Sequence, residues 1–481
     1  MKTNTTQMNN NATKGVETLL GDPKKAIIKL AIPMIIAMSV QTIYNFVDAL
    51  WVSGFGIQFF TSVDVADIGR LALAAIGFVL PFYMMAIALS TGLGVGSGSA
   101  ISRRIGAGDK EGADNVAIHS IVLTIIIAVV YSLLLFLFAE PLFTSIGAGE
   151  ATSMAVSYGQ IIFAGSFVIF FINMATAILR GEGDANRAMY AIILGTVLNI
   201  FLDPIFIFNF QLGIAGAAYA TILSMVVSSC LLAYWLFFRK NTYVSFHFRD
   251  FHFKKDILKD MFRVGVPASF QQLSMSITMM IIILIITKIA LGGDNGVAVY
   301  STGWRVVMFG ILPLLGLATA VISVTGAAYG AKDYKKLNTA FMFAIKFGFV
   351  IELVISSVIF LLAPYIAGLF TTAEGSSVIY DDLLLFIRIS CLFYPGAALG
   401  IASSATFQGA GKGVYSLIAT LIRTIVLTVI LALVFVPFFI PAIVGIWWAL
   451  VVANTIGSGI SFGWAKWLIH CLQKPKPSIK Q

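Results

Sequence analysis

The chain has 481 residues, of which 59% are hydrophobic and 11% are charged, and its formal net charge is +9. Soluble domains carry about 25% charged residues, so this composition excludes an ordinary soluble protein and indicates an integral membrane protein. The basic residues stand in short segments between apolar runs, without a basic and aromatic groove, so their charge does not indicate a nucleic-acid partner.

Counting about 20 apolar residues for each crossing predicts about twelve transmembrane helices, and therefore an all-α fold. The predicted spans begin near Lys25, Leu71, Ala113, Met154, Arg187, Gly213, Ile257, Val297, Leu337, Leu383, Gly413 and Pro441. Lys and Arg gather in the segments that alternate spans place on one side. The positive-inside rule then puts both termini in the cytoplasm.

The two halves of the chain resemble each other. Segment 92–113 aligns without gaps on segment 316–337, and LAIP at 30–33 mirrors VGVP at 264–267. This repeat predicts two pseudo-symmetric six-helix bundles.

The predicted lobes are residues 21–239 and 261–472. A basic cytoplasmic linker at 240–260 joins them, and tails at 1–20 and 473–481 flank them. Parallel repeats of this kind are how many carriers are built, whereas a channel or a receptor needs no such duplication.

The first span carries a polar stripe. Gln41, Asn45 and Asp48 recur at helical spacing, and Tyr44 stands beside Asn45. A carboxylate near the middle of a membrane helix costs about 2.5–3.5 kcal/mol, so such a residue is usually retained for a task. Asp48 is therefore the first candidate for a functional residue.

Span five adds Thr196, Asn199 and Asp203 at the same spacing, and span six adds Thr221. Asp48 and Asp203 lie at similar depth in the outer half of the membrane, so they are able to meet. Two carboxylates with amide and hydroxyl oxygens would bind a small cation such as Na⁺, or take up and release a proton. The alternative is that each aspartate only bonds a neighbouring helix.

Pro33 lies inside span one, where proline removes a backbone hydrogen bond, and we expect a hinge there. The second half repeats neither aspartate. Its weaker candidates are Glu352, Gln271, Gln272 and Arg305. The intramembrane charges, which also include Arg388 and Arg423, either form ion pairs or line a cavity.

Other classes of protein find little support. The three cysteines and four histidines are scattered, so neither a disulfide framework nor a metal site is indicated. No nucleophile and base pair or phosphate-binding loop is recognisable, so we expect no enzyme and no cofactor beyond a coupling ion.

With these residues in hand, the chain resembles the multidrug and toxic compound extrusion (MATE) transporters, in the DinF-like branch of prokaryotes. The resemblance rests on IPMIIAMSVQTIYNFVDALWVSG, RGEGD, VLNIFLDPIFIF, GIAGAAYAT and GLGVGSGSAISRRIGAGD. It implies two helical bundles around a cavity and export of organic cations against an inward flow of Na⁺ or H⁺. Coupling would use Asp48, Asn199, Asp203 and Thr221, with Pro33 as the proline of span one.

The resemblance predicts a monomeric antiporter of the plasma membrane that works by alternating access on amphipathic or cationic small molecules. A flippase for lipid-linked substrates shares this architecture and stays open as an alternative. An ion channel is the alternative of another class. The sequence does not choose between Na⁺ and H⁺.

Overall fold

The computed structural model describes residues 13–52, 66–239, 241–246, 253–290, 293–371 and 376–474; within them it leaves the side chains at 45–52, 66–73, 208, 213–214 and 376 undescribed. The described part is helical and contains no strand, which confirms the predicted fold class. The longer helices are α3 (Pro23–Val52), α5 (Ala66–Gly106), α6 (Lys110–Leu137), α8 (Thr152–Gly181), α9 (Ala185–Pro204), α10 (Gly213–Ala233), α11 (Lys255–Lys288), α12 (Gly293–Gly330), α13 (Tyr334–Phe370), α14 (Tyr380–Ser390), α15 (Phe393–Gly409), α16 (Gly413–Leu421), α17 (Leu427–Phe435) and α18 (Ala442–Gln473).

Short helices complete the described chain. They are α2 (Lys14–Leu20), α7 (Ala139–Ser145), the 3₁₀ turns η1 (Gly149–Ala151), η5 (Ser376–Ile379) and η7 (Val436–Phe438), and the π-helical turns η2 (Ile205–Asn209), η3 (Tyr234–Phe238) and η6 (Ile422–Val426). Helix α2 lies inside the predicted tail, where Val16 and Leu19 are buried. Helix α11 begins inside the predicted linker 240–260.

Eleven helices of the described chain are long and apolar enough to cross a membrane. A twelfth span is present if Ser377–Ser390 and Phe393–Gly409, which meet at a bend of 48°, form one crossing. The predicted count of about twelve is therefore confirmed, with one crossing broken in its course.

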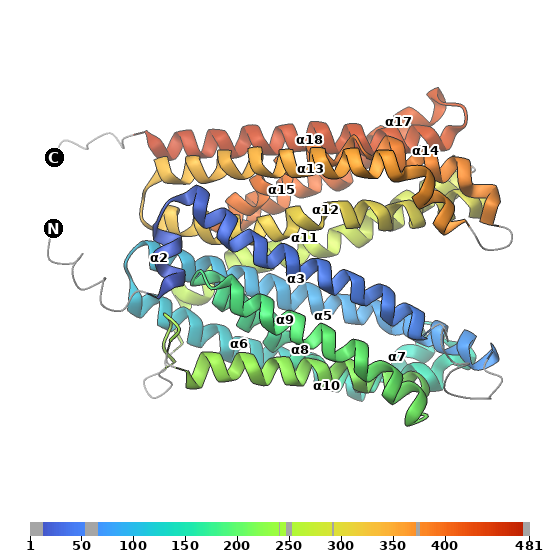
Figure 1. The fold of residues 1–481 in the computed structure, drawn as a ribbon, viewed down its shortest axis with the longest axis horizontal. Helices are drawn as coiled ribbons and strands as arrows, with labels where there is room; N and C mark the ends of the chain where they lie inside the picture. Colours follow the sequence, from blue (N-terminus) through green and yellow to red (C-terminus); the bar gives the residue numbers. More distant parts are fainter. Residues whose placement is uncertain are drawn as a thin grey trace, which may run out of the picture. The chain divides into compact units, whose positions relative to one another are not determined.

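The chain forms two compact units. Unit 1 contains residues 1–17, 36–101 and 109–269, and unit 2 contains residues 18–35, 102–108 and 270–481. Helices α3, α5 and α11 thus each contribute residues to both units. In unit 1, α8 packs against α6 and α10, and α10 also packs against α9 (Figure 1). In unit 2, α15 packs against α12, α13 and α18.

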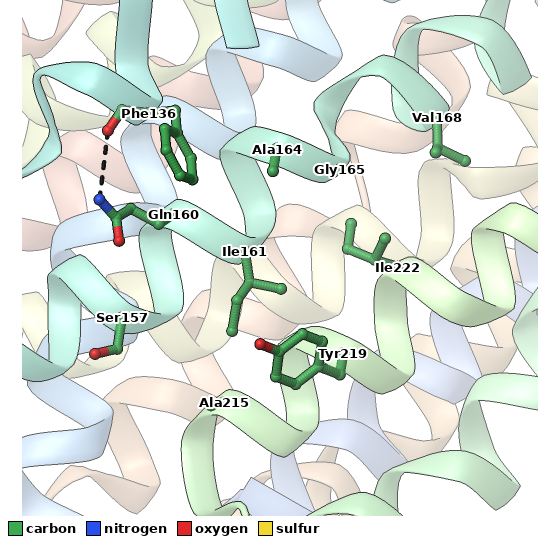
Figure 2. A pocket seen from close by; sticks show the side chains of 10 residues that line it. All are labelled: Phe136, Ser157, Gln160, Ile161, Ala164, Gly165, Val168, Ala215, Tyr219 and Ile222. Carbon is green, nitrogen blue, oxygen red and sulfur yellow. Dashed lines mark hydrogen bonds between the residues drawn. The ribbon is translucent and has the colours of Figure 1, made fainter. Parts of the chain in front are cut away.

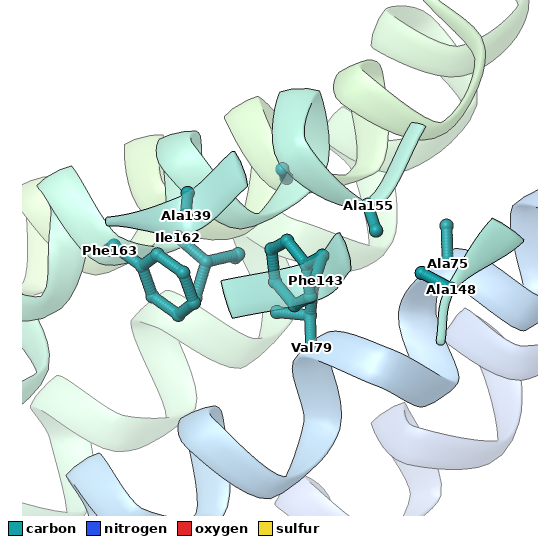
Figure 3. Packing of buried hydrophobic residues seen from close by; sticks show 9 residues of the cluster. Ala75, Val79, Ala139, Phe143, Ala148, Ala155, Ile162 and Phe163 are labelled. Atoms are coloured by element: carbon teal, nitrogen blue, oxygen red, sulfur yellow. The ribbon is translucent and has the colours of Figure 1, made fainter. Parts of the chain in front are cut away.

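A cluster of buried hydrophobic residues packs α5, α7, α8 and α10 of unit 1 together (Figure 3). Phe143 of α7 stacks on Phe163 of α8 with ring centroids 6.2 Å apart, and Phe82 of α5 meets both rings edge-on. Small residues such as Ala75 and Ala155 fill the space around these rings. Edge-to-face and offset ring pairs are favourable beyond their burial, so this cluster holds α5, α7 and α8 together.

Unit 2 has its own aromatic cluster. Trp447 of α18 stacks on Tyr300 of α12 at 6.0 Å and meets Phe386 of α14 edge-on at 4.7 Å. All three side chains are buried. Because the residues come from helices distant in sequence, the cluster defines the packing of α12, α14 and α18.

Three helices begin with an aspartate N-cap. Asp109, Asp184 and Asp333 precede α6, α9 and α13, and each accepts a hydrogen bond from the backbone N–H three residues later. An aspartate at this position satisfies an otherwise unpaired donor of the first turn. Asp109 and Asp333 occupy equivalent positions of the two repeated segments, so the repeated sequence starts a helix in the same way in each unit.

Candidate functional site

The buried polar face of α9 holds the first predicted site. Asp203 is fully buried, and its Oδ1 accepts a hydrogen bond of 2.6 Å from Nδ2 of Asn199. Thr196 is also buried, and its hydroxyl donates to the Ile192 carbonyl at 2.8 Å. The three side chains share one face because they are spaced by three and four residues. The structure thus brings Asn199 and Asp203 into direct contact.

Helix α10 packs against this helix and carries Thr221, which is half-buried. Helices α9 and α10 approach each other closely at Gly195, because a Cβ there would lie 2.5 Å from Oγ of Ser228. Ser224 is buried and donates to the Thr221 carbonyl at 2.8 Å. The polar stripe of span six therefore lies on the side of α10 that includes the contact with α9.

The polar residues of span one lie on α3. Pro33 is buried inside this helix, Gln41 is exposed and Tyr44 is half-buried. The side chains of Asn45 and Asp48 lie outside the described part of the structure. The meeting of Asp48 with Asp203 and the hinge at Pro33 therefore stay predictions.

The described residues include no group of three or more His, Cys, Asp or Glu side chains able to hold a metal ion. The donors on α9 and α10 are instead one carboxylate, one amide and hydroxyls. This set suits a monovalent hard cation or a proton.

In the second lobe, Gln271 of α11 connects three helices. Its Nε2 donates to Ser404 at 2.8 Å and to Thr420 at 2.6 Å, and its Oε1 accepts from Gln408 at 2.9 Å and from Ser416 at 3.3 Å. Gln271 thus uses both ends of its amide to link α11, α15 and α16. Its four partners were not predicted. One of them, Gln408, begins the sequence QGAG at 408–411, which corresponds to RGEG at 180–183 in the first half.

The other second-lobe candidates do not join this hydrogen-bond network. Gln272 and Arg305 are exposed, and Arg388 lies over the Phe360 ring at 5.6 Å. Glu352 is fully buried, and neither of its carboxylate oxygens has a hydrogen-bond partner among the residues that the structure describes. Within the described chain, Arg305, Arg388 and Glu352 form no ion pair, so the ion-pair alternative finds no support there.

Sequence reasoning missed a carboxylate at the end of α8. Glu182 is 1% exposed, and its Oε2 accepts backbone N–H groups from Tyr243 at 2.8 Å and Val244 at 3.2 Å. Asp114 of α6 accepts the next N–H, from Ser245, at 2.7 Å. Two carboxylates thereby hold segment 241–246 against the end of α8 and the start of α6. The signal in the sequence was the acidic residue of the RGEGD motif.

Burial raises the pKa of Glu182 from its ordinary 4.5 to about 8. The nearby Asp184 acts in the same direction, while the two backbone hydrogen bonds and Arg187 lower the pKa. The carboxyl group therefore has a pKa of about 8 at the point where segment 241–246 is attached.

A groove of about 680 Å³ runs along α8 between α6 and α10. Figure 2 shows Ile161, Tyr219 and Ile222 around this groove, with Gln160 reaching the carbonyl of Phe136 at 3.5 Å. Its lining is mainly apolar and contains none of the predicted site residues.

Comparison with known proteins finds relatives along most of the chain. Multidrug export protein MepA of Staphylococcus aureus is 26% identical over 435 residues, covering 90% of this chain and 91% of that protein. Probable multidrug resistance protein YoeA of Bacillus subtilis is 25% identical over 404 residues, covering 82% and 86%.

Solved structures are more similar. A transporter of the MOP superfamily from Pyrococcus furiosus is 49% identical with a TM-score of 0.90, covering 96% of this chain and 100% of that one. A MATE in the bent conformation is 48% identical with a TM-score of 0.87, covering 96% and 99%. The family model MatE matches residues 33–205 and 267–434. The chain therefore belongs to the MATE family of membrane transporters.

Proposed function

We propose that the protein is a secondary active antiporter that exports amphipathic or cationic small molecules in exchange for inward H⁺ or Na⁺. Its relatives MepA and YoeA are named for multidrug export and multidrug resistance. The single observation that supports coupling most directly is the buried carboxylate of Asp203, bonded to Asn199 inside a membrane helix. A carboxylate in that place is costly unless it binds a cation or a proton during the cycle.

The coupling site in this proposal consists of Asp48, Asn199, Asp203 and Thr221. The site takes up the ion from the outside, and the first lobe then rearranges so that the exported compound leaves outward. Loss of the ion to the cytoplasm reverses the change. Alternating access of this kind is typical of carriers built from repeats.

The orientation of Asn199 bears on the identity of the ion. Its Nδ2 faces Asp203, so the amide donates to the carboxylate and its own oxygen is turned away. A Na⁺ held by both residues requires the amide oxygen to face the ion, whereas proton uptake by Asp203 requires no such turn. Rotation of this amide is therefore an expected step of Na⁺ coupling only.

The test uses purified protein in liposomes, with transport of ethidium or norfloxacin followed under an imposed Na⁺ gradient and then an imposed pH gradient. The variants are Asp203→Asn and Asp48→Asn. The matched control is Glu140→Gln, which removes an exposed carboxylate on α7. We expect one gradient to drive transport by the wild type and the control, and neither to drive the two aspartate variants.

Transport by the wild type that needs no gradient, or coupled transport that survives in both aspartate variants, would contradict the proposal. Lipid-linked substrates would then be tried next, because a flippase shares the architecture. Steady currents far faster than exchange would indicate a channel instead. We further propose that the protein acts as a monomer in the plasma membrane with both termini in the cytoplasm.

A further inference from the structure

Arg423 lies in the middle of a membrane-spanning helix of unit 2. The span begins at Gly413, so Arg423 is about 15 Å along its axis. The residue belongs to the π-helical turn η6, which interrupts the helix between α16 and α17. Single π-helical turns inside α-helices occur frequently at functional sites. A charged side chain at this depth normally has a partner or a task.

No partner for the guanidinium is present among the described residues. The side chain of Arg423 forms neither a hydrogen bond nor an ion pair with them, and only its backbone carbonyl is bonded, to the Thr428 hydroxyl at 3.1 Å. The five N–H donors of the guanidinium therefore lack an acceptor among the described residues.

Two glycines and a serine surround Arg423, with Gly400 and Ser458 beside its guanidinium and Gly457 against its backbone and stem. The point where a Cβ on Gly400 of α15 would lie is 2.4 Å from Nη1 of Arg423 and 2.5 Å from Oγ of Ser458 on α18. A Cβ on Gly457 would lie 2.7 Å from Cα of Arg423. The arginine therefore fits between α15 and α18 only because these two positions carry no side chain.

Ser458 is a second donor at the same place. It is fully buried, and its hydroxyl has no hydrogen-bond partner in the described chain. A buried hydroxyl without a partner costs free energy, as does an unpaired guanidinium. Both costs disappear if a group that accepts hydrogen bonds from both residues binds between them.

We propose that Arg423 and Ser458 form a binding site for one anionic oxygen group, a carboxylate or a phosphate, on an amphipathic molecule. The planar guanidinium donates two parallel hydrogen bonds to such a group, and the serine hydroxyl adds a third. Arg423 is only half-buried, so a ligand can reach it. The bound group belongs either to a soluble amphipathic compound or to an anionic phospholipid.

The experiment measures binding without any gradient, so it does not depend on the antiport proposed above. Protein purified in neutral detergent is titrated with 11-(dansylamino)undecanoic acid and with its methyl ester, and dansyl fluorescence reports binding. Phosphatidylglycerol and phosphatidylcholine are then tested as competitors. The variants are Arg423→Gln, Arg423→Lys and Ser458→Ala, and Lys346→Gln is the control because it removes an exposed cation of the same unit.

We expect the wild type and the control to bind the acid at least about tenfold more tightly than the ester, the fold-change of one charge-assisted hydrogen bond. Arg423→Gln should bind both probes equally, and Arg423→Lys and Ser458→Ala should fall between. If Arg423→Gln does not fold, the proposal is tested with Arg423→Lys and Ser458→Ala, which should each show a smaller preference for the acid than the wild type. Displacement of the acid by phosphatidylglycerol but not phosphatidylcholine assigns the site to a lipid phosphate, and no displacement assigns it to a soluble carboxylate. Equal binding of acid and ester by the wild type, or a preference that survives in Arg423→Gln, overturns the proposal.

Discussion

The attachment of segment 241–246 to the end of α8 should depend on pH through Glu182. In the docked state this carboxyl is buried, and its pKa is about 8 in place of 4.5. When the segment leaves, Glu182 meets water and regains its ordinary pKa. The docked state therefore binds the proton more tightly, so a rise in pH favours release of the segment.

The size of the effect follows from the two pKa values. Docking is strongest below pH 4.5, weakens as pH rises, and becomes independent of pH above about 8. Within this window each pH unit changes the free energy of docking by at most about 1.4 kcal/mol, which is about tenfold in the equilibrium between docked and released segment.

Hydrogen exchange at the amides of Tyr243 and Val244 measures this equilibrium directly, because these amides donate to Glu182. After correction for intrinsic exchange, their protection should fall by up to about tenfold per pH unit between pH about 5 and 8. Glu182→Gln keeps the size of the side chain but cannot titrate, so its protection should not change with pH. The exposed control Glu140→Gln should retain the full slope. A flat profile in the wild type, or the same slope in Glu182→Gln, would refute the reasoning.

Three further predictions concern packing and topology. Gln271→Leu should lower the melting temperature by several degrees because it removes the hydrogen bonds of Gln271 to Ser404, Thr420, Gln408 and Ser416, each worth about 0.5–1.5 kcal/mol. The exposed Gln272→Leu should have little effect, and equal melting of both variants would argue against the network. Gly195→Ala should destabilise the contact of α9 with α10 by about 1–3 kcal/mol, because the added Cβ would lie 2.5 Å from Oγ of Ser228. Ser228→Ala in the same chain should restore most of the lost stability, since the added Cβ would lie 3.5 Å from the Cβ of residue 228. Additive losses in a double-mutant cycle would show that the contact is absent. In a variant that retains Cys471 as its one cysteine, an impermeant maleimide should label the exposed thiol only in permeabilised cells; labelling of intact cells would place the C-terminus outside.

The sequence by itself determined the helices and their polar faces. Apolar runs long enough to cross a membrane predict the spans within a few residues, since a bilayer accepts few other structures. The spacing of Asn199 and Asp203 predicts one face of one helix, and the structure confirms their contact. The repeated segments align Asp109 with Asp333, and the structure gives both residues the same capping role because capping is a local interaction within one turn.

Only the tertiary structure decided which side chains find partners. Periodicity tells which face of a helix a residue occupies, but not which other helix meets that face. Gln271 gained partners more than 130 positions away, Glu182 gained the backbone of a later segment, and Arg423 gained none among the described residues. These outcomes depend on close approach between helices distant in sequence, which glycines such as Gly400 permit and which no local pattern records.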